Sequence, residues 1–92
     1  MTEEQFVQHI EEIEQHFHQT IAQGSEQELF ISSYLNGHFD LMVSRALNMG
    51  IYNTEALDQA IRQSLQKAFD NSELEPDDQQ QVITLWQRLS DK

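Results

Sequence analysis

Hydrophobic residues recur at helical spacing along most of the chain, and the clearest case is the stretch from Glu26 to Met49. At 100° per residue, its apolar side chains cover an arc of about 220°. The arc holds Phe30, Ile31, Tyr34, Leu35, Phe39, Leu41, Met42, Val43, Ala46 and Met49, and the polar strip holds Ser33, Asn36, Gly37, Asp40, Ser44 and Asn48. A helix of this kind must be covered from more than one side, so we expect it to be the central helix of a bundle.

The preceding stretch predicts a helix from about Thr2 to Ala22 with a single narrow apolar seam. The seam consists of Phe6, Ile10, Ile13, Phe17 and Ile21. Gly24 is suited to a left-handed C-terminal cap, and Ser25 with Glu28 three residues later predicts a capping box that begins the long helix. Because this connection is so short, we expect the first two helices to form an antiparallel hairpin.

Two shorter helices are predicted after the long one. Gly50 is expected to end the long helix, and Thr54 is expected to cap a third helix from about Glu55 to Asp70. Its apolar face holds Leu57, Ala60, Ile61, Ser64, Leu65, Ala68 and Phe69. Pro76 suits the first position of a fourth helix that ends near Ser90. Its apolar side holds Val82, Leu85, Trp86 and Leu89.

No useful stretch alternates in the manner of a strand, so the fold class predicted is all-α. We expect residues 1–92 to form a single domain, a four-helix antiparallel up-down bundle with a long first hairpin and a shorter second one. The second hairpin is too short to cover the whole long helix. The remaining part of the long helix would be covered by the chain termini or by another subunit.

The chain is strongly acidic, with five basic and sixteen acidic residues and a net charge of −11. This charge argues against binding to nucleic acid or to an anionic membrane surface. Half of the acidic residues lie near predicted helix starts, where they favour the helix dipole: Glu3, Glu4, Glu26, Glu28, Glu55, Asp58, Asp77 and Asp78. Much of the acidity is therefore explained by helix capping and solubility.

Cysteine is absent, which excludes disulfides and thiolate metal sites and fits a reducing compartment. No apolar run approaches the roughly 20 residues of a membrane span. The N-terminus is acidic where a secretory signal is basic. We therefore expect a cytoplasmic protein.

Two stretches carry a resemblance to a known family. The first runs Glu28-Leu-Phe-Ile-Ser-Ser-Tyr-Leu-Asn-Gly-His38 and on to Val43, and the second runs Gln63-Ser-Leu-Gln-Lys-Ala68, then Glu73-Leu-Glu-Pro-Asp-Asp-Gln79 and Trp86. In order and spacing they resemble the YfcL family of small bacterial proteins, over about residues 26–89. Glu75 departs from the pattern, because a small hydroxyl cap is expected before the proline. The resemblance implies a helical bacterial cytoplasmic protein and carries over no catalytic residue.

His38 is the candidate functional residue that the pattern singles out. It lies within the apolar arc, with Tyr34 one turn before it and Arg45 two turns after it on nearly the same line. Such a trio can bind an anionic group or act in acid–base chemistry, with His38 as the proton carrier and Arg45 as the anchor. Alternatively, His38 is held by a backbone carbonyl or a carboxylate and only fixes helix packing. We favour packing, because no nucleophile or second titrating group accompanies the trio.

A metal site is a weaker possibility on the first helix. His9, Glu12 and His16 share one flank, and Glu12 with His16 has a spacing that can chelate a divalent ion. The further ligands that such an ion needs are not evident. We therefore expect no metal and no other cofactor.

The sequence favours an acidic module that binds a protein partner or forms a homodimer. Ile51, Tyr52 and Ile83, together with uncovered parts of the long helix, are its candidate contact surface. The alternative is a ligand-binding protein or an enzyme with a pocket lined by His38, Tyr34 and Arg45. The first function requires an exposed apolar patch, and the second requires an enclosed cavity that His38 faces. A nucleic-acid mimic is less favoured, because its carboxylates would have to form a row along one face.

Overall fold

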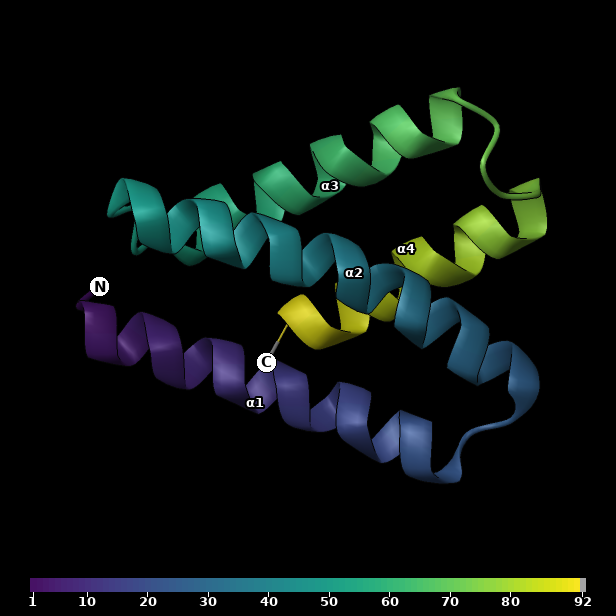
Figure 1. The fold of residues 1–92 in the computed structure, drawn as a ribbon, viewed down its shortest axis with the longest axis horizontal. Coiled ribbons are helices and arrows are strands. Elements are labelled where there is room, and N and C mark those ends of the chain that lie inside the picture. Colours follow the sequence, from purple (N-terminus) through teal and green to yellow (C-terminus); the bar gives the residue numbers. More distant parts are fainter. Residues whose placement is uncertain (92) are drawn as a thin grey trace.

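The chain folds into four helices, and the long second helix lies at their centre (Figure 1). The computed structural model describes residues 1–91, apart from the side chain of Ile21. Within this range the helices are α1 (Glu3–Gln23), α2 (Glu26–Met49), α3 (Thr54–Asp70) and α4 (Pro76–Ser90). Helices α1 and α2 form the predicted long antiparallel hairpin, and the shorter α3 and α4 follow it, which confirms the predicted all-α fold class with four helices. The predicted place of Ile21 on the seam of α1 lies outside the described side chains.

Helix α2 packs against each of the other three helices, whereas α3 and α4 make little contact with each other. In Figure 1, α1 and α3 flank α2 while α4 passes behind it. The three helices therefore cover the sides and the back of α2. Its remaining face carries Phe30, Ser33, Gly37, Leu41, Ser44 and Asn48, all of them exposed, and we call these residues the open face.

The core is built around aromatic rings from three helices. Phe39 of α2 is fully buried, and its ring centre lies 5.6 Å from that of Phe17 in α1 and 5.9 Å from that of Trp86 in α4. Each such ring pair contributes about 0.5–1.5 kcal/mol beyond the area that it buries. The indole N–H of Trp86 donates a hydrogen bond of 2.6 Å to Asp58 of α3. Phe39 and Trp86 therefore connect all four helices.

The apolar arc of α2 is wider than the surface that its neighbours cover. Phe30, Leu41 and Met49 were predicted to be covered, but they are 44%, 49% and 70% exposed. The reason is geometric: no helix lies on the open face that carries Phe30 and Leu41, and Met49 is the last residue of α2. Leu35 and Phe39, on the opposite face, have no exposed surface. The prediction that α2 is covered from more than one side is confirmed. The apolar residues Phe30 and Leu41, at the edge of the predicted apolar arc, are not covered.

The long helix begins and ends at the predicted residues. Ser25 and Glu28 form the predicted capping box, and Gly50 ends α2 in the left-handed conformation with φ at 69°. The prediction of a left-handed cap at Gly24 is wrong, because its backbone is extended with φ at −81°. Ser25 follows at once as the N-cap of α2 and is itself extended. The hairpin therefore has no room for a separate left-handed turn.

The third helix begins one residue earlier than predicted. Asn53 is the N-cap instead of Thr54, and its Oδ1 accepts hydrogen bonds from the N–H groups of Glu55 and Ala56 at 2.8 and 3.1 Å. A single amide oxygen thus satisfies two backbone donors that a helix start leaves free. Glu75, which precedes α4, makes no side-chain capping bond. Its departure from the family pattern therefore coincides with an uncapped helix start.

Gly37 within α2 and Gly50 at its C-terminal end provide a test of stability. Gly50→Ala is expected to lower the free energy of unfolding by about 1 kcal/mol, because a side chain disfavours a left-handed backbone. Gly37→Ala is expected to raise it by roughly 0.5–1 kcal/mol through helix propensity. At Gly37, nothing lies within 4 Å of an added Cβ. Urea unfolding at low protein concentration measures both changes, and effects of the same sign would contradict this account.

Candidate functional site

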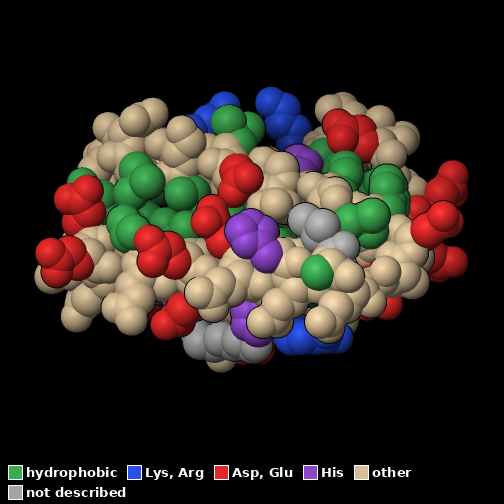
Figure 2. All heavy atoms as spheres, turned by 60° about the horizontal axis from the view of Figure 1, so that its bottom comes forward, with side chains coloured by type: hydrophobic (Ala, Val, Ile, Leu, Met, Phe, Trp, Pro, Cys, Tyr) green, Lys and Arg blue, Asp and Glu red, His purple; other side chains and the backbone are tan. Residues whose placement is uncertain are grey.

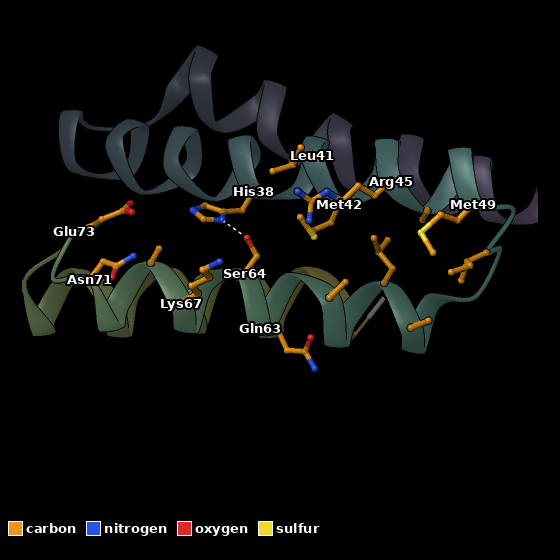
Figure 3. Close-up of a pocket in the computed structure, with 16 residues that line it drawn as sticks. His38, Leu41, Met42, Arg45, Met49, Gln63, Ser64, Lys67, Asn71 and Glu73 are labelled. Carbon is orange, nitrogen blue, oxygen red and sulfur yellow. Dashed lines mark hydrogen bonds between the residues drawn. The ribbon is translucent and has the colours of Figure 1, made fainter.

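A groove with a volume of about 580 Å³ runs between α2 and α3 (Figure 3). Small side chains at steps of four along α3, namely Ala56, Ala60, Ser64 and Ala68, line one wall. They leave a hollow where larger residues would interdigitate with α2. The wall on α2 holds His38, Leu41, Met42, Arg45, Ala46 and Met49. The result is a largely apolar channel with a few polar groups.

His38 spans this groove from α2 to α3. Its Nδ1 lies 2.7 Å from the Oγ of Ser64, within hydrogen-bonding distance, as the dashed line in Figure 3 marks. A hydroxyl can either donate or accept, so this bond is compatible with both the neutral and the protonated imidazole. The side chain is half-buried. His38 therefore has a structural partner, although the partner is a hydroxyl and not the carbonyl or carboxylate considered above.

Tyr34 lies beside His38 but does not line the groove. Its ring centre is 4.9 Å from that of His38, and its hydroxyl donates a 3.1 Å hydrogen bond to Glu73. Burial, assisted by the hydrogen bond and the negative charge of Glu73, raises the pKa of Tyr34 to about 12. The phenol therefore stays neutral at physiological pH and acts as a donor. The trio of the sequence hypothesis separates into two parts, with His38 and Arg45 at the groove and Tyr34 outside it.

Positive charge reaches the groove from both walls. Arg45 of α2 and Lys67 of α3 line it, and they are two of the five basic residues in the sequence. Among residues 1–91, no carboxylate lies within ion-pairing distance of either side chain, whereas Arg62 pairs with Asp58 at 3.0 Å. The groove thus combines apolar surface with two cationic side chains that have no ionic partner among residues 1–91.

The three residues predicted as a contact surface occupy different environments. Ile51 is exposed and lines the groove near the end of α2. The ring of Tyr52 packs against Phe6 of α1, with ring centres 6.0 Å apart. Ile83 is partly buried against the core. Ile51 therefore adjoins the groove, and the other two residues contribute mainly to packing.

Most of the exposed large hydrophobic side chains belong to α2 or to the turn after it. They are Leu29, Phe30, Leu41, Leu47, Met49 and Ile51, in addition to Met1. On the face drawn in Figure 2, hydrophobic groups are interrupted by acidic and histidine side chains, and Lys and Arg side chains appear only at its upper and lower edges. On this face, apolar surface is therefore available in patches among acidic and other polar groups.

Two carboxyl groups face each other where α1 meets α2. Burial, and then the negative charge of Asp40, raise the pKa of Glu14. When the native pKa lies above the unfolded value, the native state binds more protons between the two values. Stability is therefore lost as the pH rises through the native pKa of Glu14.

This pair gives a pH-dependent prediction. Glu14→Gln is expected to raise the urea midpoint at pH 7, because the amide needs no ionisation beside Asp40. The gain should shrink toward about pH 4, where the wild-type carboxyl group is increasingly protonated in both states. Glu12→Gln, at an exposed position of the same helix, is the control. An equal gain from both variants at pH 7 would contradict the assignment.

No group of three or more His, Asp or Glu side chains within the described part of the chain is arranged to hold a metal ion. His9, Glu12 and His16 accordingly do not belong to a larger ligand cluster there. Within the same part of the chain, no helix combines the length and apolar composition needed to cross a bilayer.

Comparisons with known proteins agree with the resemblance seen in the sequence. The protein-family model described as "YfcL protein" matches residues 5–91. A curated relative from Escherichia coli (strain K12), named "Uncharacterized protein YfcL", is 37% identical over 65 residues, which cover 71% of each chain. No solved structure matches.

Proposed function

For this chain, which belongs to the YfcL family, we propose the function of a cytoplasmic protein–protein interaction module. Its binding surface is the open face of α2 together with the adjoining groove. One observation carries the proposal, namely that the central helix of the fold leaves Phe30 and Leu41 exposed. Exposed large apolar side chains cost free energy in water, and several of them on one side of a small protein commonly mark a contact site.

The groove supports a partner that is apolar on one side and acidic along its edge. Leu41, Met49 and Ile51 offer an apolar contact surface, and methionine adapts readily to different partner shapes. Arg45 and Lys67 have no ionic partner among the described residues, so they favour a carboxylate from outside. Charges of this kind chiefly determine orientation and association rate.

Binding of a small anionic ligand is the second candidate. A volume of about 580 Å³ lies within the usual range for ligand pockets, and the groove combines His38 with two cations. However, Leu41 and Met49 on its wall are exposed, so the site is not the enclosed cavity that enzyme chemistry favours. A protein partner therefore fits the exposed apolar area better.

Photo-crosslinking in living cells of the organism that encodes the chain tests the interaction. A photoreactive amino acid replaces Leu41 on the open face, and in the control it replaces Gln59, which is exposed on α3. We expect protein adducts from position 41 and none from position 59. The mass of the adduct distinguishes a second copy from another protein. The proposal fails if position 41 gives no adduct or if both positions give the same ones.

A further inference from the structure

Five exposed positions of α2, together with the partly buried Tyr34, follow the spacing of a coiled coil. Phe30, Tyr34, Gly37, Leu41, Ser44 and Asn48 follow one another in steps of four, three, four, three and four. We call these six residues the outer seam. None of them is charged, although sixteen acidic residues occur in the chain. The seam thus combines two large exposed apolar side chains, Phe30 and Leu41, with small or uncharged polar residues of the predicted polar strip, and no charge has to be buried when it is covered.

Gly37 lies near the middle of this seam and is exposed. A glycine inside a helix costs about 1 kcal/mol relative to alanine. Nothing in the chain uses the space above it, because no atom lies within 4 Å of an added Cβ. What glycine does allow is the close approach of another group to the helix backbone.

We propose that this group belongs to a second copy of the chain, with two α2 helices packed antiparallel through their outer seams. This inference rests on the proposed function and names its partner. In an antiparallel pair centred between Leu35 and Asn36, Phe30 faces the partner's Leu41. The same register places the exposed edge of Tyr34, whose ring packs on His38, against the partner's Gly37, where no side chain obstructs the approach. A two-fold interface requires a surface that fits itself in this way.

Charge favours the same arrangement. The register brings Arg45 level with the first turn of the partner's α2. Negative charge is present there from Glu26 and from Asp78, which accepts a 2.8 Å hydrogen bond from the amide of Gln27. Arg45 has no ion pair within the described part of its own chain. In an in-register parallel pair Arg45 would instead lie level with the partner's Arg45, away from the acidic first turn.

The seam is about 27 Å long at 1.5 Å per residue. We expect a contact between two single helices of this length to be weak and to dissociate at micromolar concentrations. Sedimentation equilibrium should therefore show a mass that rises with concentration from 10.8 kDa toward twice that value. Gly37→Gln should raise the dimer dissociation constant by about tenfold or more, because its side chain must enter a packed contact.

Two controls separate association from folding. Gly37→Gln is expected to keep the wild-type circular dichroism spectrum, since its Cβ meets nothing in the monomer. Leu29→Gln removes an exposed hydrophobic side chain of α2 that lies off the seam, and it should leave the dissociation constant unchanged. Equal weakening by both variants would overturn the assignment of the seam.

Disulfide trapping tests the register, because the chain contains no cysteine of its own. Neither Phe30→Cys nor Leu41→Cys alone should form a covalent dimer under oxidation, whereas a mixture of the two variants should form one. Such a bond requires Cα atoms about 4.4–6.8 Å apart. Covalent dimers of either variant alone, or none in the mixture, would overturn the antiparallel register. A wild-type protein that stays monomeric while position 41 captures another protein would overturn self-association and leave the proposed function intact.

Discussion

Replacing Phe39 by alanine is expected to lower the free energy of unfolding by about 3–5 kcal/mol. The Phe39 ring is fully buried and touches the rings of Phe17 and Trp86, so its removal opens a cavity where α1, α2 and α4 meet. A domain of this length has a total stability of about 5–14 kcal/mol. The variant should therefore be close to unfolding at 37 °C.

The matched control is Phe30→Ala, which makes the same change in the same helix on its open face. Phe30 lies 44% exposed, so its loss should alter the stability of the monomer by less than about 0.5 kcal/mol. Urea unfolding followed by circular dichroism, at a concentration where dimers dissociate, gives both values. Similar losses from the two variants would mean that the assignment of buried and open faces is incorrect.

Trp86→Ala is the second substitution with a large expected effect, again about 3–5 kcal/mol. It removes both the packing of the indole and its hydrogen bond to Asp58. Trp86→Phe retains most of the packing and loses the hydrogen bond to a carboxylate, which is worth about 1.5–3 kcal/mol. The lower end applies, because Asp58 also binds Arg62 and is partly exposed.

A double-mutant cycle of Trp86→Phe with Asp58→Ala isolates that hydrogen bond. If it links α3 to α4, the double variant should lose less stability than the sum of the two single variants. Unfolding must be followed by circular dichroism, because Trp86 is the single tryptophan in the sequence and its fluorescence is lost. Additive losses would show that the contact contributes nothing of its own.

Local patterns predicted the helices because each signal involves residues a few positions apart. The capping box of Ser25 with Glu28 and the left-handed cap at Gly50 are of this kind. The errors occurred where two local signals competed. Gly24 adjoins a second helix start, and Asn53 caps α3 at the position before Thr54.

The groove could not be predicted in the same way, because it depends on how α2 and α3 cross. His38 meets Ser64, which lies 26 residues further along the chain, and helical periodicity does not identify such a partner. The width of the apolar arc of α2 indicated how much surface could be buried. It did not indicate that neighbours would leave Phe30 and Leu41 open. The small residues of α3, from Ala56 to Ala68 in steps of four, were the one available sign of a hollow.

The limited contact between α3 and α4 also affects how the chain acquires its structure during synthesis. A ribosome releases α1 and α2 first, and these two helices can pair as a local hairpin. The later helices then find most of their binding surface already formed on α2, and the hydrogen bond between Trp86 and Asp58 links them once both have docked. The order of the chain thus matches an order of assembly in which each new helix adds to an existing platform.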